Sequence, residues 1–136
     1  MIGYSGTPLA KKLGYKPEHK VYLHQAPENY LSLLGDLPEN LTFLQSLNER
    51  ADLIHLFSKQ AAEMEKCLFQ FKEKIVPNGC IWVSWYKKAA KIPTDITEDV
   101  IRETALALGL VDIKVCAVDE KWSGLKLVIR RENRYK

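Results

Sequence analysis

Short apolar stretches alternate along the chain with amphipathic segments, and turns rich in glycine and proline separate them. Residues 51–57, ADLIHLF, and residues 80–86, CIWVSWY, are almost continuously apolar, which is typical of strands covered on both faces. Between them, apolar residues from Met64 to Ile75 recur at helical spacing and predict a helix over residues 59–75.

Capping residues mark the ends of the helices. Thr7 and Pro8 suit the start of a helix that Gly14 ends, and Thr97 suits the start of another before an acidic first turn. The complete expected order is helix 7–14, strand 20–25, helix 27–35, strand 41–45, strand 51–57, helix 59–75, strand 80–86, helix 98–108 and an antiparallel hairpin of residues 110–120 and 122–131.

The hairpin alternates apolar and polar positions, which predicts one apolar face along each of its strands. On the first strand this face is expected to hold Val111, Ile113, Val115 and Ala117, and on the second Leu125, Leu127 and Ile129.

Strands that alternate with helices predict a mostly parallel sheet with helices on both faces. We therefore expect one three-layer, Rossmann-like α/β domain over residues 1–136, with residues 1–6 as a flexible arm and residues 132–136 as a basic tail. A terminal hairpin after such a core resembles the class I methyltransferase-like Rossmann fold, in reduced form, because one strand-helix unit is missing between residues 36 and 51. The resemblance implies that the last strand inserts antiparallel between its two predecessors.

A second resemblance concerns particular phrases of the sequence. GYSGTPLAKKLG, LIHLF and VDIKVCAVDEKWSGLK resemble a bacterial family of small uncharacterised proteins, a domain of unknown function. The resemblance covers about half of the chain and implies no activity.

Composition narrows the class of protein further. The net charge is only +3, and although basic residues gather at 85–91 and 129–136, acidic residues are mixed in throughout the chain, so nucleic acid is not the expected partner. The apolar runs are far shorter than the ~20 residues that span a bilayer, and the N-terminus lacks the apolar segment of a signal peptide. A cytoplasmic location without membrane contact is expected, and the oligomeric state stays open.

Candidate ligand-binding residues gather where the predicted strands end. In open α/β sheets, ligands bind beyond the carboxyl ends of the strands. We expect Asp119 and Trp122 to form one wall of a pocket there, opposite Trp85 and Lys87. A purely structural role is the alternative, with Trp85 in the core and Trp122 over the sheet edge. The full set of candidates is Gln25, Ser84, Trp85, Lys87, Asp119, Trp122 and Ser123.

The sequence argues against the usual cofactors of this fold. A bound dinucleotide or S-adenosylmethionine needs a glycine-rich first turn and an acidic residue after the second strand, but the chain has Gln25-Ala26-Pro27 and Gln45-Ser46. Cysteines and histidines are scattered without metal-ligand spacing, so neither a cofactor nor a metal is expected.

Two weaker possibilities remain at this stage. Gly6 and Thr7 are candidates for binding an anion at the first helix, although a capped helix alone explains them. His24, near a strand end, is a possible general base, whereas His55 is expected to be a buried neutral histidine.

The leading functional interpretation is a non-enzymatic protein that binds a partner or a small ligand at the strand edge. The alternative is a small divergent transferase that uses Lys87, Asp119 and Trp122. The glycine-free first turn favours binding, and no catalytic residue is nominated.

Overall fold

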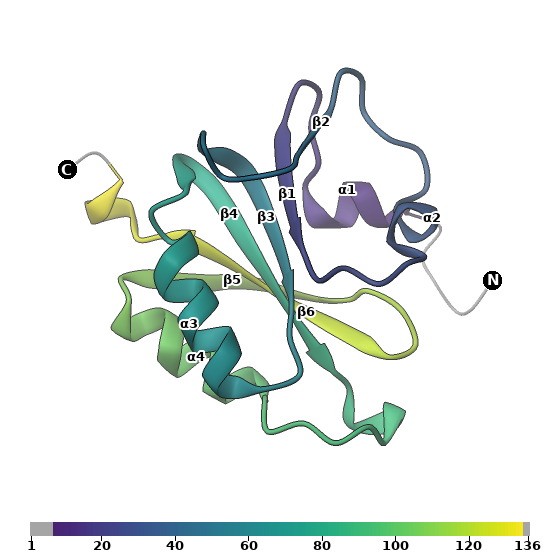
Figure 1. Ribbon diagram of the computed structural model, residues 1–136, viewed down its shortest axis with the longest axis vertical. Helices are drawn as coiled ribbons and strands as arrows, with labels where there is room; N and C mark the ends of the chain where they lie inside the picture. The colour runs from purple at the N-terminus through teal and green to yellow at the C-terminus, as the bar shows by residue number, and fades with distance from the viewer. Residues whose placement is uncertain (1–6, 135–136) are drawn as a thin grey trace.

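The computed structural model describes residues 7–134, which form one six-stranded sheet with the strand order β2-β1-β3-β4-β6-β5 (Figure 1). The strands are β1 (Lys20–His24), β2 (Thr42–Leu44), β3 (Ala51–Phe57), β4 (Ile75–Tyr86), β5 (Leu110–Ala117) and β6 (Trp122–Ile129). The helices are α1 (Leu9–Leu13), α2 (Tyr30–Leu34), α3 (Ala61–Phe71) and α4 (Glu98–Ala107), with short 3-10 helices η1 (Lys88–Ala90) and η2 (Arg131–Asn133).

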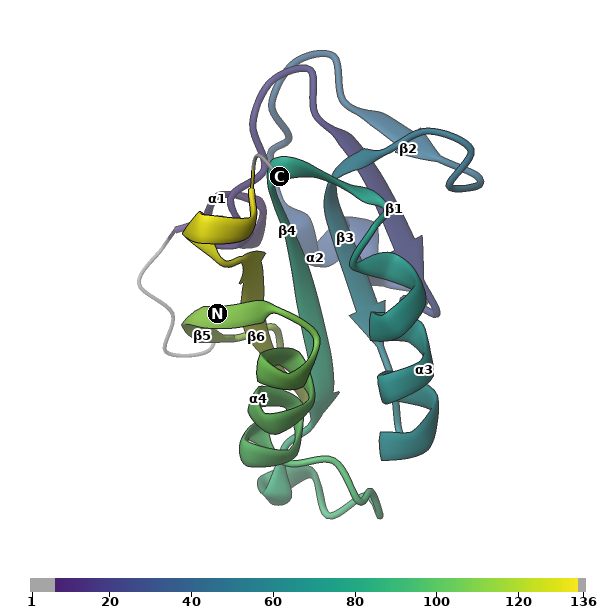
Figure 2. The ribbon, with the colours of Figure 1, turned by 90° about the vertical axis from the view of Figure 1, so that its left-hand side faces the viewer.

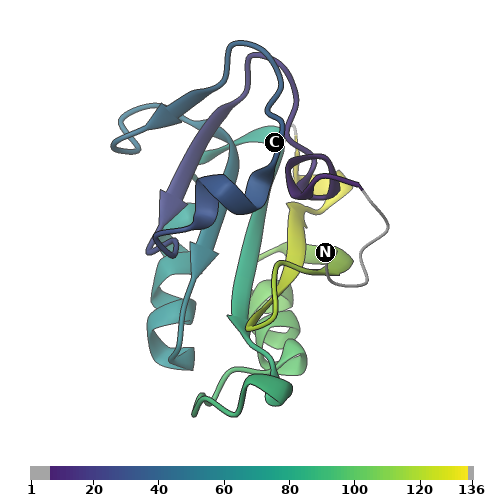
Figure 3. The ribbon, with the colours of Figure 1, turned by 90° about the vertical axis from the view of Figure 1, so that its right-hand side faces the viewer.

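Helices cover both faces of the sheet, as the sequence predicts. Helices α3 and α4 lie on one face, and α1 and α2 lie on the other (Figures 2 and 3). The first face has a core that includes Leu68 and Ile101, and the second has a core that includes Leu13 and Tyr30. The expected three-layer α/β architecture is confirmed.

The topology places five strand ends at one edge of the sheet. Strands β2, β1, β3 and β4 pair in parallel, and β6 runs antiparallel between β4 and β5. The insertion of the last strand between its two predecessors is the arrangement that the methyltransferase-like resemblance implies. The carboxyl ends of β1 to β5 and the β5–β6 turn therefore meet at the same edge.

The helix expected over residues 59–75 is shorter in the structure, because Ile75 begins β4 instead of ending the helix. Ala51 pairs with Ile75 and Leu53 pairs with Cys80, so β4 bulges while β3 continues. Gly79 makes the bulge possible, since a Cβ there would lie 2.8 Å from the backbone oxygen of Asp52.

The single apolar face expected for the first hairpin strand is wrong. The β5–β6 register shifts between Asp112 and Lys114. Residues that strict alternation would place on one face, such as Val111 and Val115, therefore lie on opposite faces of the sheet. Strand β5 is also an edge strand, and Ile113 and Val115 are 57% and 51% exposed.

The helix ends agree with the sequence in part. The Thr97 side chain accepts a hydrogen bond from Val100 N at 3.1 Å, as expected, and Gly14 ends α1 with a φ of 87°. Pro8, not Thr7, occupies the N-cap of α1, so Thr7 lies one residue outside it.

The expected basic tail is partly built into the fold. Arg134 Nε donates to the backbone oxygen of Ile129 at 3.0 Å, just beyond η2. The expected arm, residues 1–6, lies outside the described residues. No helix within residues 7–134 combines the length and apolarity needed to cross a bilayer.

Candidate functional site

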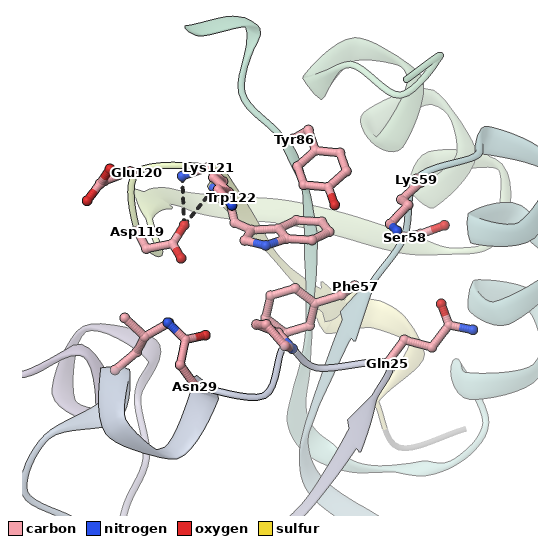
Figure 4. Close-up of a pocket in the computed structure, with 12 residues that line it drawn as sticks. Gln25, Asn29, Phe57, Ser58, Lys59, Tyr86, Asp119, Glu120, Lys121 and Trp122 are labelled. Atoms are coloured by element: carbon pink, nitrogen blue, oxygen red, sulfur yellow. Dashed lines mark hydrogen bonds between the residues drawn. The ribbon is translucent and has the colours of Figure 1, made fainter. Parts of the chain in front are cut away.

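An open cleft of about 640 Å³ lies at the carboxyl edge of the sheet (Figure 4). Gln25 follows β1, Phe57 ends β3 and Tyr86 ends β4, so parallel strands bring these distant residues together. The β5–β6 turn supplies Asp119 and Trp122. The cleft thus occupies the place where open α/β sheets bind their ligands.

Aromatic side chains form one wall of the cleft. The Tyr86 ring stacks on the Trp122 indole, with ring centroids 4.1 Å apart and planes inclined by 26°. Phe57 meets the indole edge-on at 5.0 Å. Lys59 Nζ lies 5.9 Å from the centroid of the Tyr86 ring, which places a positive charge beside the wall.

The aromatic wall carries two hydrogen-bond donors, the indole N–H of Trp122 and the hydroxyl of Tyr86. Within residues 7–134, neither Trp122 Nε1 nor the Tyr86 hydroxyl has a hydrogen-bond partner, and neither is a buried unsatisfied group. Asp119 Oδ1 accepts from the backbone nitrogens of Lys121 and Trp122, both at 2.8 Å, and so holds the turn in shape. Unpaired donors beside an occupied carboxylate favour a ligand with acceptor oxygens.

A chain of four hydrogen-bonded side chains lies beneath the aromatic wall. Tyr15 and Tyr30 share a hydrogen bond of 2.7 Å between their hydroxyls, and Tyr30 Oη lies 2.8 Å from His55 Nδ1. His55 Nε2 lies 2.7 Å from Ser84 Oγ. Phe57 stacks on His55 at 4.3 Å and separates this chain from the cleft.

Burial keeps the members of this chain neutral. Desolvation lowers the pKa of His55 to about 3 and raises the pKa values of Tyr15 and Tyr30. Ser84 and His55 have the spacing of a nucleophile and its base, but both are 0% exposed. A substrate therefore has no access to them, and their role is structural.

The structure divides the sequence candidates among four places. Gln25, Asp119 and Trp122 line the cleft, while Ser84 is buried in the chain beneath it. Trp85 and Lys87 line a second pocket instead. Ser123 is half-buried at the start of β6, outside the lining of the cleft.

The expected pairing of Trp85 and Lys87 with Trp122 and Asp119 is wrong. Successive strand residues point to opposite faces, so Trp85 belongs to the core under α3 and α4 while Trp122 belongs to the other core. Tyr86 takes the place that was expected for Trp85. Alternation along CIWVSWY would have found Tyr86, because its parity matches that of Trp82.

Neither His24 nor Thr7 lines the cleft. His24 Nε2 lies 3.5 Å from Cys67 Sγ, and the imidazole ring packs against Phe71 of α3. His24 is therefore no general base for this cleft. Gly6 lies outside the described residues, and Thr7 is exposed.

The first turn does not fit S-adenosylmethionine, the cofactor that this fold implies. Gln25 has a φ of 56°, so the left-handed turn is present but carries a side chain where glycine would let the ligand approach the backbone. Pro27 lacks an amide donor, and α2 starts only at Tyr30. Gln45 and Ser46 follow β2 and offer no carboxylate to ribose hydroxyls. Within residues 7–134, no three His, Cys, Asp or Glu side chains are grouped to hold a metal.

Solved methyltransferase structures are similar to the chain in fold. Magnesium protoporphyrin IX methyltransferase from Synechocystis PCC 6803, with bound SAH, gives a TM-score of 0.60 at 10% identity over 89% of this chain and 78% of that chain. A S-adenosylmethionine-dependent methyltransferase from Clostridium acetobutylicum ATCC 824 gives 0.59 at 7% identity over 88% and 86%. No family model and no curated protein matches the chain. At such identities the likeness shows the fold alone, and the protein has a methyltransferase-like Rossmann fold.

Proposed function

We propose that the protein binds a small, flat ligand with acceptor oxygens in the cleft at the carboxyl edge, without S-adenosylmethionine and without catalysing a reaction. The observation that carries this proposal is the aromatic wall with an unpaired indole N–H at Trp122. The exposed amides of Gln25 and Asn29 lie across the cleft from Tyr86 (Figure 4). Apolar surface with a few placed polar groups is the usual composition of small-molecule sites.

The charges at the cleft favour a carboxylate or phosphate on the ligand. Lys59 stands beside Tyr86, and Lys121 stands on the turn. Of the two acidic residues that line the cleft, Asp119 is engaged with the turn amides, and Glu120 lies across the view from Lys59 in Figure 4. A ligand anion near Lys59 would meet an ammonium group without a close carboxylate.

Binding fits the cleft better than catalysis does. Acid-base catalysis usually places a group with a shifted pKa within reach of substrate. Here His55 and Tyr30, whose pKa values burial shifts, lie under Phe57 and outside the lining. The alternative of a divergent transferase is supported by the methyltransferases of like fold, but the turn after β1 does not fit their cofactor. We also propose that the protein belongs to the bacterial family that its sequence resembles and that it is located in the cytoplasm.

Conservative changes at the aromatic wall are expected to weaken binding without unfolding the protein. Trp122→Phe keeps an aromatic ring but removes the indole N–H, and Lys59→Gln removes the positive charge beside Tyr86. Each change should raise the dissociation constant about tenfold, as loss of one charge-assisted hydrogen bond does. A thermal-shift screen of flat carboxylic acids and phosphate esters identifies ligands, and calorimetry then measures each variant.

Lys66→Gln, on the exposed side of α3, is the matched control and should bind as the wild type does. Ligands whose affinity is equal in the wild type, Trp122→Phe and Lys59→Gln would refute the cleft as the binding site. Product formation that depends on added S-adenosylmethionine would instead support the transferase.

A further inference from the structure

A second pocket, of about 540 Å³, lies beside the loop between β4 and α4. This loop is at the bottom of the molecule in Figure 2, on the side of α4. The floor of the pocket is apolar and consists of Trp85, Ile92, Pro93 and Ile96. The pocket shares Tyr86 with the cleft, but its other lining residues are its own.

Side-chain and backbone contacts hold this loop in place. Lys87 N donates to the oxygen of Lys121 at 2.8 Å, which fixes the start of the loop to the β5–β6 turn. Thr94 Oγ1 donates to the oxygen of Lys59 at 2.6 Å, and Asp95 Oδ1 accepts from Ala61 N at 2.7 Å. The pocket is therefore preformed, which lowers the entropic cost of filling it.

A nearly buried tryptophan presents an unpaired donor at this pocket. Trp85 is 8% exposed, yet within residues 7–134 its Nε1 has no hydrogen-bond partner and is not a buried unsatisfied atom. Buried indole N–H groups usually have a partner, as Trp82 Nε1 does with the oxygen of Leu13 at 2.7 Å. The Trp85 N–H is thus available to an acceptor in the pocket that Trp85 lines.

The lysines around the pocket give it a positive charge. Lys87, Lys88 and Lys91 all line it, and none of the three makes an ion pair within the described residues. Glu98, the acidic residue of the lining, pairs with Arg102. Three ammonium groups without carboxylate partners favour a ligand with more than one negative charge.

We propose that this loop pocket binds a small organic anion with a flat apolar group and two or more negative charges, such as a nucleoside diphosphate. The faces of the flat group contact Ile92, Pro93 and the indole edge of Trp85, and the Trp85 N–H donates to an acceptor atom at the edge of that group. The charged groups lie among Lys87, Lys88 and Lys91, since lysine binds phosphate as a point charge. The site is distinct from the cleft of the proposed function and does not depend on it.

Nuclear magnetic resonance of the indole N–H groups tests this proposal directly. The chain has three tryptophans, and Trp→Phe variants assign their three signals. Titration with ADP should shift the Trp85 signal saturably, and the signal of Trp82, which is bonded to Leu13, should stay in place. Inorganic pyrophosphate, which lacks a flat group, should bind more weakly than ADP.

The variant Lys87→Gln/Lys88→Gln/Lys91→Gln should weaken ADP binding at least about tenfold, with an unchanged Trp82 signal as evidence of folding. A matched control, Lys66→Gln/Lys72→Gln/Lys74→Gln, makes the same change of charge elsewhere and should bind ADP normally. If the triple variant unfolds, Lys91→Gln alone serves. A Trp85 signal that does not respond, equal affinity of the lysine variant, or a shift of Trp122 in place of Trp85 would overturn the proposal.

Discussion

Lowering the pH from about 7 to about 5 is expected to reduce the free energy of unfolding by about 2 kcal/mol, mainly through His55. Complete burial lowers the pKa of His55 to about 3 in the folded protein, from the ordinary value of 6.5. The ring hydrogen-bonds to Tyr30 and Ser84, and its partners are neutral hydroxyls. Within residues 7–134 no carboxylate pairs with the ring to compensate a positive charge, so the folded state holds this histidine neutral.

The direction of the effect follows from proton binding. Below a pH of about 6.5 the unfolded chain binds a proton at His55, whereas the folded chain binds it only near pH 3. Acid therefore favours the unfolded state. The stabilising contribution of neutral His55 is fully present above the unfolded pKa and is lost as the pH falls toward the folded pKa. Between about pH 7 and about 5 most carboxylates stay charged, so the change in stability over this range reports on the histidine.

Urea unfolding at several pH values measures the slope. His55→Gln keeps hydrogen-bonding groups but cannot gain a proton, so its stability should change little over this range. His19→Gln is the matched control at a less buried site and should keep most of the wild-type slope. A full slope in His55→Gln would show that another group is responsible.

Gly79→Ala is expected to destabilise the fold by about 3 kcal/mol, the upper part of the range for overpacking. The added Cβ would lie 2.8 Å from the oxygen of Asp52 and 3.1 Å from the oxygen of Val76, and backbone atoms cannot move aside as flexible side chains do. Relief would require the β4 bulge to reshape its pairing with β3.

Asn78→Ala is the control for this substitution, because Asn78 is the exposed neighbour of Gly79 in the same bulge. Chemical unfolding at neutral pH should show a change within about 0.5 kcal/mol for the control. A Gly79→Ala protein as stable as the control would mean that the strands do not approach as closely as the structure shows.

Patterns within one segment could be predicted from the sequence. The apolar run at Ala51–Phe57 is strand β3 to the residue, and Thr97 caps α4 as its place before an acidic turn indicates. These features depend on neighbours in the chain, whose side chains are visible in the sequence. The order of such elements predicted the mostly parallel sheet, and the resemblance to the methyltransferase-like fold implied its inserted last strand.

Features that depend on a partner strand could not be predicted in the same way. The bulge before Cys80 and the register shift at Ile113 arise from pairing with β3 and β6, and each changes which residues face the core. The hydrogen-bonded chain from Tyr15 to Ser84 joins residues that lie far apart in the sequence. The place of Trp85 at the strand end predicts that it lines the cleft, but its side chain lies on the other face of the sheet and lines the second pocket.

The structure joins a methyltransferase-like scaffold to an edge that does not fit the cofactor of that scaffold. The strand order and the arrangement of the strand ends are those of the fold, and a residue in the left-handed backbone conformation follows β1. The residue is Gln25, however, and Pro27 comes two positions later. The cleft that remains is lined by aromatic rings and hydrogen-bond donors.

Calorimetric titration with S-adenosylmethionine tests this account most directly. We expect no saturable binding with a dissociation constant at or below about 1 μM, equivalent to about −8 kcal/mol. The reason is the turn at Gln25 and Pro27 together with the missing carboxylate after β2. Binding at or below about 1 μM would contradict the account, because the chain would then hold the cofactor without the turn that the fold normally uses.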